Sequence, residues 1–410
     1  MVKANPERAL RDLYELREMG RYKTGVHRPT LSPEDVASRR WLAAKLADIG
    51  HSATIDGIAN VFGRAPGAGP HVLAGSHIES QNQSGWLDGA LGVIYALEAA
   101  RAVAEDPAMA GRGVDVIAFV DEEGHFGQFL GSYSFAGQLD EATIDAATDR
   151  SGRGPMRSLL GEAGLAGVPR VTMDPARYRA FFEAHIEQGR RLEAEGLTIG
   201  VVTSIIAIWQ YKITVEGAQN HAGTTTMAER RDAGTAMMRI WHRIEERFPD
   251  VIGQHSVWTV GRTELTPGAP SIIPGLAEML FQFRDAEMEV LERLHEALAA
   301  IVAEVDAEGP CTARLTQLAR PMPGRMDPSL QAALLASGEA LTPGQTLVMP
   351  SAAGHDAQIM SQHVPSAMMF VPSIGGVSHH WTEDTSDADI KDGAAVFVDA
   401  IARVLAADGG

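Results

Sequence analysis

The sequence has little cysteine and a shortage of positive charge. Among 410 residues there is one cysteine, Cys311, so no disulfide can form within the chain and a thiolate-rich metal site is excluded. Asp and Glu number 53 against 35 Lys and Arg, which gives a net charge of −18 at pH 7. Nucleic acids and anionic membrane surfaces are bound by clustered Lys and Arg, so neither is an expected partner.

Long hydrophobic runs are also missing. No apolar run approaches the roughly 18 residues that a membrane span needs, and the first residues, MVKANPERALRDLYELREMG, are charged and amphipathic rather than signal-like. We therefore expect no membrane segment and a cytoplasmic location. What the chain does have is 45% hydrophobic residues and 42 glycines, a composition typical of a globular enzyme with room for two cores.

The stretch from Gly75 to Gly92, GSHIESQNQSGWLDGALG, places His77 and Asp88 in one polar loop. An apolar strand pattern precedes the loop and a helical pattern follows it, which is where α/β proteins place ligand chemistry. Asp88 could equally be the N-cap of that helix. Taken alone, the loop leaves the structural and the functional interpretations equally open.

Two further strands end in polar side chains. The apolar run 114–120 is followed by Asp121, Glu122 and Glu123, and the strand 179–184 is followed by His185. Adjacent carboxylates oppose one another's ionisation, so either a solvated loop or a divalent cation must compensate them. Three successive strand ends with such side chains predict one polar site.

From Trp209 onward the pattern of elements changes. The periodicities predict strand 211–215, helix 227–247, strand 256–260, strand 278–283, helix 287–305 and strand 312–318. This β-α-β-β-α-β order predicts a ferredoxin-like domain at 206–322, inserted into an α/β catalytic domain formed by 1–205 and 323–410. The catalytic domain should contain a central sheet flanked by helices.

Six segments together resemble one family. GSHIESQNQSGWLDGALG, DEEGHFGQFLGS, EAHIEQG, NHAGTTTMAERRD, SAAGHDA and GVSHHWTEDT follow the order and spacing of the hydantoinase/carbamoylase amidohydrolases. That family includes N-carbamoyl-L-amino acid hydrolase, β-ureidopropionase and allantoate amidohydrolase. The resemblance covers residues from about 70 to 390.

The resemblance implies a dinuclear metal centre. Two divalent ions would share Asp88; His77 and His185 would complete one site, and Glu123 and His379 the other. Nitrogen and carboxylate ligands suit Zn, Mn, Co or Ni alike, so the metal is left open. If the SHH segment were aligned one residue differently, His380 would replace His379, although His379 keeps Glu383 at its family spacing.

The resemblance also implies the reaction. Glu122 would act as general base on a metal-bound water, which supplies the attacking hydroxide, and would then pass that proton to the leaving nitrogen. His221, in the inserted lid domain, would stabilise the oxyanion in the opposite subunit of a homodimer. The positions that would contact a small, carboxylate-bearing substrate are Gln188, Asn220, Ser271, Arg284, Ala353 and Gly354.

Several positions depart from the family pattern. Glu79 replaces the Asp that orients the ligating imidazole, and we expect it to serve the same purpose from a shifted backbone. Ser271, Gln282 and Ala352 replace the usual Asn, Asp and Gly near the substrate. We therefore expect the hydrolysis to be retained on an altered substrate.

The resulting prediction is a metal-dependent hydrolase of a linear amide or ureido C–N bond. The default substrate is an N-carbamoyl-L-amino acid, and allantoate or another N-acyl amine is the alternative. A protein of another class, a catalytically silent dimeric binding protein, would show damaged ligands, and none is visible in the sequence.

Overall fold

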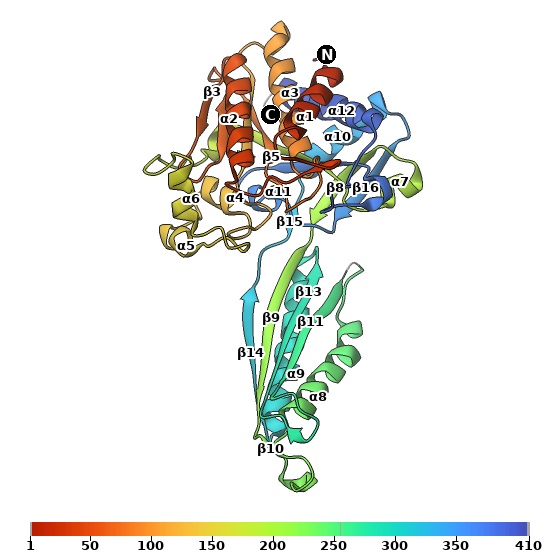
Figure 1. The fold of residues 1–410 in the computed structure, drawn as a ribbon. Helices are drawn as coiled ribbons and strands as arrows, with labels where there is room; N and C mark the ends of the chain where they lie inside the picture. Colours follow the sequence, from red (N-terminus) through yellow and green to blue (C-terminus); the bar gives the residue numbers. More distant parts are fainter. Residues whose placement is uncertain (1, 255, 408–410) are drawn as a thin grey trace. The chain divides into compact units, whose positions relative to one another are not determined.

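The computed structural model describes residues 2–254 and 256–407. The chain divides into two compact units (Figure 1). Residues up to Ile205 and from Gly324 onward form the first unit, and Ile206–Pro323 form the second. Within the described ranges, no helix combines the length and the apolar character that crossing a membrane requires.

The first unit is built on a nine-stranded mixed sheet. Its strands lie in the order β15-β8-β17-β7-β5-β6-β4-β3, with β16 paired to β8. The bounds are β3 Ser52–Ile55, β4 Val61–Arg64, β5 His71–His77, β6 Gly113–Phe119, β7 Tyr178–Ile186, β8 Ile199–Ile205, β15 Gly324–Arg325, β16 Thr346–Ser351 and β17 Ser366–Val371. The prediction of a central sheet flanked by helices is confirmed. Strand β8 was not among the expected elements.

The four central strands β6, β5, β7 and β17 run parallel, so their carboxyl ends share one edge of the sheet. They are buried on both faces, which explains their continuous apolar sequences. Val72 and Ala74 face one hydrophobic cluster while Leu73 between them faces another. Every polar side chain that directly follows these strands is therefore brought to a single edge.

Helices cover both faces of this sheet. The larger cluster contains residues of α1 (Pro6–Arg17), α2 (Pro33–Asp48), α3 (Ala90–Glu105), α10 (Pro328–Leu341) and α12 (Asp387–Ala406). The opposite face packs against α4 (Leu130–Phe135) and α11 (Asp356–Met360). The remaining helices of this unit are α5 (Glu141–Ala146), α6 (Met156–Glu162) and α7 (Arg191–Glu195), and a two-stranded hairpin, β1 (Arg21–Tyr22) and β2 (Gly25–Val26), precedes α2.

The second unit has a four-stranded antiparallel sheet in the order β11-β13-β9-β14. In the chain its elements are β9 (Ala207–Glu216), α8 (Ala233–Arg247), β11 (Val257–Thr266), β13 (Leu276–Asp285), α9 (Met288–Glu308) and β14 (Thr312–Ala319). Alternate residues of β9 are buried, and Trp209, Tyr211 and Ile213 share a hydrophobic cluster with apolar residues of both helices. The same unit contains a separate antiparallel pair of short strands, β10 (Asn220–His221) and β12 (Ile272–Ile273).

The start of helix α8 corrects the sequence prediction. We expected the helix to begin at Met227, but Met227–Glu229 form a single 3-10 turn and the α-helix begins at Ala233. Asp232 caps it, because its Oδ1 accepts a hydrogen bond from the N–H of Thr235 at 3.0 Å. The predicted helix therefore began too early: it included the segment before Asp232, which lies outside the α-helix.

Candidate metal centre

The centre is assembled from strand ends. His77 is the last residue of β5, His185 is the penultimate residue of β7, and Glu122 and Glu123 follow β6. Asp88 enters from the loop before α3. Because β5, β6 and β7 are parallel neighbours, side chains far apart in the sequence meet at one edge.

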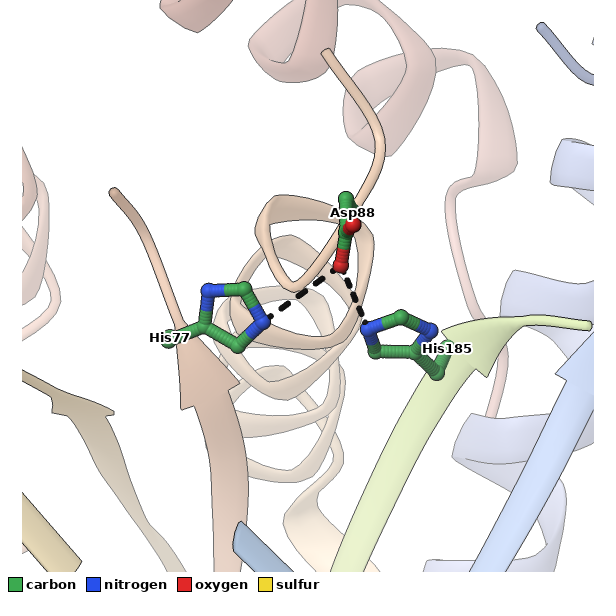
Figure 2. Close-up of side chains that lie close together, drawn as sticks. All are labelled: His77, Asp88 and His185. Carbon is green, nitrogen blue, oxygen red and sulfur yellow. Dashed lines mark ion pairs between the residues drawn. The ribbon is translucent and has the colours of Figure 1, made fainter. Parts of the chain in front are cut away.

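Asp88 lies at the middle of the cluster. Its Oδ1 is 2.9 Å from Nε2 of His185 and 3.5 Å from Nε2 of His77, and its Oδ2 is 3.2 Å from Nε2 of His379. Figure 2 shows the two histidines pointing at the carboxylate from separate strands. Burial alone would raise the pKa of Asp88, but its contacts with His185, His379 and His77 hold that pKa well below its usual range.

Two groups of side chains could each hold a metal ion. One contains His77, Asp88 and His185, and the other contains Asp88, Glu123 and His379; within each group the ligand atoms lie within 4.8 Å of one another. Asp88 belongs to both. The neighbouring His380 points elsewhere, because its Nδ1 lies 2.7 Å from the hydroxyl of Thr382.

The tautomers of the two buried histidines suit cation binding. Nδ1 of His185 lies 2.9 Å from the carbonyl oxygen of Ile186, and Nδ1 of His77 lies 3.2 Å from that of Glu79. With Nδ1–H donating to its carbonyl, each Nε2 carries a lone pair; that of His185 accepts the N–H of Gly89 at 3.1 Å, and that of His77 faces Asp88 and Glu122. Nε2 of His77 is buried without a hydrogen-bond partner, which is what a metal-ligand position predicts.

The acids after β6 are in an unfavourable electrostatic environment. Burial, partly offset by His77 and reinforced by Glu123, raises the pKa of Glu122 well above its usual value. Burial and the nearby Asp88 also raise the pKa of Glu123. A cation would relieve this cost, so the donor set fits a divalent metal both in chemistry and in charge.

Glu79 does not act as the sequence suggested. We expected its carboxylate to orient the imidazole of His77, but the nearer oxygen is the main-chain carbonyl, and the carboxylate Oε1 is 3.9 Å from Nδ1. That carboxylate instead accepts the N–H of Glu122 at 2.8 Å and pairs with the guanidinium of Arg39 at 2.6 Å. The longer side chain passes the imidazole and reaches the next loop.

Three residues just before or within the centre have left-handed backbone conformations. The φ angles of Asp121, Gln188 and His379 are 62°, 57° and 56°. Such angles cost of order 1–3 kcal/mol at a residue other than glycine and persist where the surrounding structure holds them. Their concentration at one edge of the sheet is typical of a functional site.

Further residues support the centre without belonging to either ligand group. Glu383 accepts the N–H of Asp88 at 3.1 Å, and burial together with Asp88 raises the pKa of Glu383 to about 8. His355 packs edge-on against His185 with ring centroids 4.5 Å apart. The amide of Gln188, expected to contact substrate, donates to Oδ2 of Asp88 at 3.1 Å. The sequence around an acidic loop or a single histidine does not indicate which residues that side chain will contact.

The other predicted substrate positions are divided between the two units. Ala353 and Gly354 lie in the loop after β16, where a Cβ on Gly354 would come 2.9 Å from the ring of Phe129. In the second unit, strand pairing places His221 opposite Ile272, and the N–H of Ala222 bonds the carbonyl of Ser271, so Asn220, His221 and Ser271 are neighbours. Arg284 is on β13, opposite Ile208 of β9.

Comparison with known proteins gives consistent results. The profile of peptidase family M20/M25/M40 matches residues 71–403. An N-carbamoyl-L-amino-acid amidohydrolase from Paenarthrobacter aurescens is 33% identical over 97% of this chain and 98% of its own length. An allantoate amidohydrolase from Bacillus subtilis is 32% identical over 90% of this chain and 91% of its own. The crystal structure of a hydantoinase/carbamoylase family amidase from Burkholderia phymatum is 44% identical, with a TM-score of 0.88 over 99% of this chain and 98% of that one.

Proposed function

The chain belongs to peptidase family M20/M25/M40, and within it we propose a hydrolase of linear amide or ureido C–N bonds whose default substrate is an N-carbamoyl-L-amino acid. The observation that carries the proposal is Asp88, whose two carboxylate oxygens face histidines from three different segments. A single acid shared by two ligand groups is the arrangement that a dinuclear hydrolase needs.

Two divalent cations are the proposed cofactors, held by His77, Asp88 and His185 on one side and by Asp88, Glu123 and His379 on the other. Zn, Mn, Co and Ni all suit nitrogen and carboxylate ligands. Such a pair would supply Lewis acidity and a water of lowered pKa when bound. The buried Nε2 of His77, which has no hydrogen-bond partner, supports this assignment.

Glu122 is the proposed general base. It lies outside both ligand groups, its Oε2 is 3.6 Å from Nε2 of His77, and its side chain keeps 11% of its surface exposed. A carboxylate in that position can take a proton from the attacking water and deliver it to the leaving nitrogen. Glu79 holds the backbone N–H of Glu122, so the side-chain carboxylate of Glu122 can move from the attacking water to the leaving nitrogen.

The second unit is proposed as a dimerisation and lid domain. Its His221 would stabilise the oxyanion in the partner subunit's site, and Arg284 would bind the substrate carboxylate as a bidentate fork. Gln188, Asn220, Ser271, Ala353 and Gly354 are proposed to complete the substrate contacts. Support comes from His221 being exposed, with its Nδ1 accepting the N–H of Gly223 at 3.0 Å and so leaving Nε2 for a ligand.

Allantoate is the second candidate substrate. The allantoate amidohydrolase from Bacillus subtilis is as similar in sequence as the carbamoylase, at 32% against 33% identity. Ser271, Gln282 and Ala352 differ from the usual residues beside the substrate, which favours an acyl group or side chain unlike that of a simple N-carbamoyl amino acid. Ammonia release from a panel of substrates distinguishes the two.

The test combines metal content with turnover. The purified protein should contain about two divalent cations per chain and release ammonia from an N-carbamoyl-L-amino acid or from allantoate. Two cations without ammonia from either would refute the substrate proposal while keeping the site. A chain that binds no divalent cation would refute the metal centre and favour a silent binding protein.

A further inference from the structure

The two adjacent acids after β6 are held in different ways by one loop. Glu79 binds only the backbone of Glu122, whereas Gln81, two residues later, binds the carboxylate of Glu123. The backbone N–H of Gln81 donates to Oε1 of Glu123 at 3.0 Å, and its side-chain Nε2 donates to Oε2 at 2.8 Å. The same Nε2 is 2.8 Å from the carbonyl oxygen of Glu123.

This pattern immobilises Glu123 without neutralising it. Each carboxylate oxygen has two lone pairs, so one neutral donor on each leaves a lone pair per oxygen for a cation. A Lys or Arg at position 81 would compete with the metal by charge, but an amide does not. The side chain of Glu123 is only 3% exposed, so water cannot replace these donors freely.

Arg150 determines which way the amide of Gln81 faces. Its Nη2 donates to Oε1 of Gln81, which leaves the NH₂ group directed at Glu123. The backbone N–H of Arg150 is in turn bonded to the carbonyl oxygen of His125 at 2.9 Å, so the arginine is anchored to the loop that follows the two acids. Arg150 therefore fixes the orientation of the Gln81 amide, and that amide in turn holds the carboxylate of Glu123.

We propose that Gln81 is a positioning residue that holds Glu123 ready to bind the second cation. The other proposed ligands of that cation are Asp88 and His379. Glu122 receives no contact from Gln81 and is left free to act as the base. The assignment rests on the proposed dinuclear centre. It explains why two neighbouring glutamates can differ in role: the donors of Gln81 reach the carboxylate of Glu123, whereas the carboxylate of Glu122 receives none of them and lies 3.6 Å from Nε2 of His77.

The experiment compares Gln81→Met with two reference variants. Methionine keeps the length of the side chain and removes its donors. Asn82→Ala is the matched control, because Asn82 is exposed and its amide bonds the hydroxyl of Ser151 rather than an acid. His379→Ala removes a proposed ligand of the second position outright. Zinc content after dialysis, zinc affinity by competition with a chelator, and urea unfolding are measured for each.

Gln81→Met should resemble His379→Ala, with about one zinc per chain retained and the affinity of the second zinc lowered by about 10- to 100-fold, the usual effect of losing a residue that supports a ligand. Asn82→Ala should keep both ions. Two zinc ions bound to Gln81→Met with unchanged affinity would overturn the proposal, and so would loss of both ions from a variant that unfolds at the wild-type urea concentration. If the wild type binds no zinc, manganese, cobalt or nickel, the metal centre itself is wrong, which is a different result from the failure of Gln81.

Discussion

Glu79 and Glu122 are joined directly, because the backbone N–H of Glu122 donates to Oε1 of Glu79 at 2.8 Å. The other oxygen of Glu79 pairs with Arg39 at 2.6 Å, and Arg39 also contacts Asp35 at 3.0 Å. All three charged side chains of that network are buried. Helix α2, which carries Asp35 and Arg39, is thus connected through Glu79 to the backbone of the proposed base.

This network yields a prediction with an internal control. Glu79→Gln and Asp35→Asn each remove one negative partner of Arg39, and each should lower the free energy of unfolding by about 1.5–3 kcal/mol, the value of a hydrogen bond to a charged group. Only Glu79→Gln should also lower kcat, by about tenfold or more, because only Glu79 contacts Glu122. Urea unfolding and steady-state kinetics measure the two effects. Equal kcat losses in both variants would show that the network is merely structural.

Glu122→Gln should separate binding from chemistry. The amide is nearly the same size but cannot accept the proton of the attacking water, so kcat should fall by about 10²- to 10⁴-fold. Metal content should not change, since Glu122 is outside both ligand groups. Glu162→Gln, on an exposed position at the end of α6, is the control. Loss of a cation from Glu122→Gln would make Glu122 a ligand and not the base.

Gly89→Ala should displace His77. Gly89 has φ 66°, and a Cβ there would lie 2.4 Å from three atoms of the imidazole. Gly111 also has a positive φ, 83°, but a Cβ at that position has no atom within 4 Å. Gly111→Ala should therefore show only the backbone strain, about 1–3 kcal/mol, while Gly89→Ala should also lose metal affinity. Chelator competition and urea unfolding of both variants measure the difference, and equal metal affinities would contradict it.

His125 should make stability fall as the solution is acidified. Burial lowers the pKa of His125 to about 4, whereas the unfolded value is about 6.5. The unfolded chain therefore takes up a proton between these values and the folded chain does not, so stability present above about pH 6.5 is lost toward pH 4. The loss between pH 7 and pH 5 is about 2 kcal/mol for this one group.

His125→Gln should remove that part of the pH dependence. The difference between wild type and variant in the free energy of unfolding, measured in urea at pH 7 and at pH 5 with the same metal concentration, isolates the contribution. His242→Gln is the control, because the side chain of His242 is 73% exposed. A pH dependence that His125→Gln leaves unaltered would mean that the pKa of His125 is the same in the folded and the unfolded chain.

Patterns in the sequence were enough to predict which segments supply the candidate site. Continuous apolar runs are the mark of strands buried on both faces, and the polar residues that directly follow them must lie at a sheet edge; His77, Glu123 and His185 could be found in this way. The family resemblance then supplied the assignments of Asp88 and His379. The periodicity placed the start of α8 too early, at Met227, because it did not identify Asp232 as the capping residue.

The contacts that those residues make became visible in the folded chain alone. Glu79 was expected to orient His77, yet its Oε1 accepts the backbone N–H of Glu122 at 2.8 Å and lies 3.9 Å from Nδ1 of His77. The contact of Gln81 with Glu123 joins residues 42 positions apart. No local pattern encodes such a contact, since hydrogen bonds between loops depend on how the strands beneath them are registered and on which donor each buried carboxylate meets.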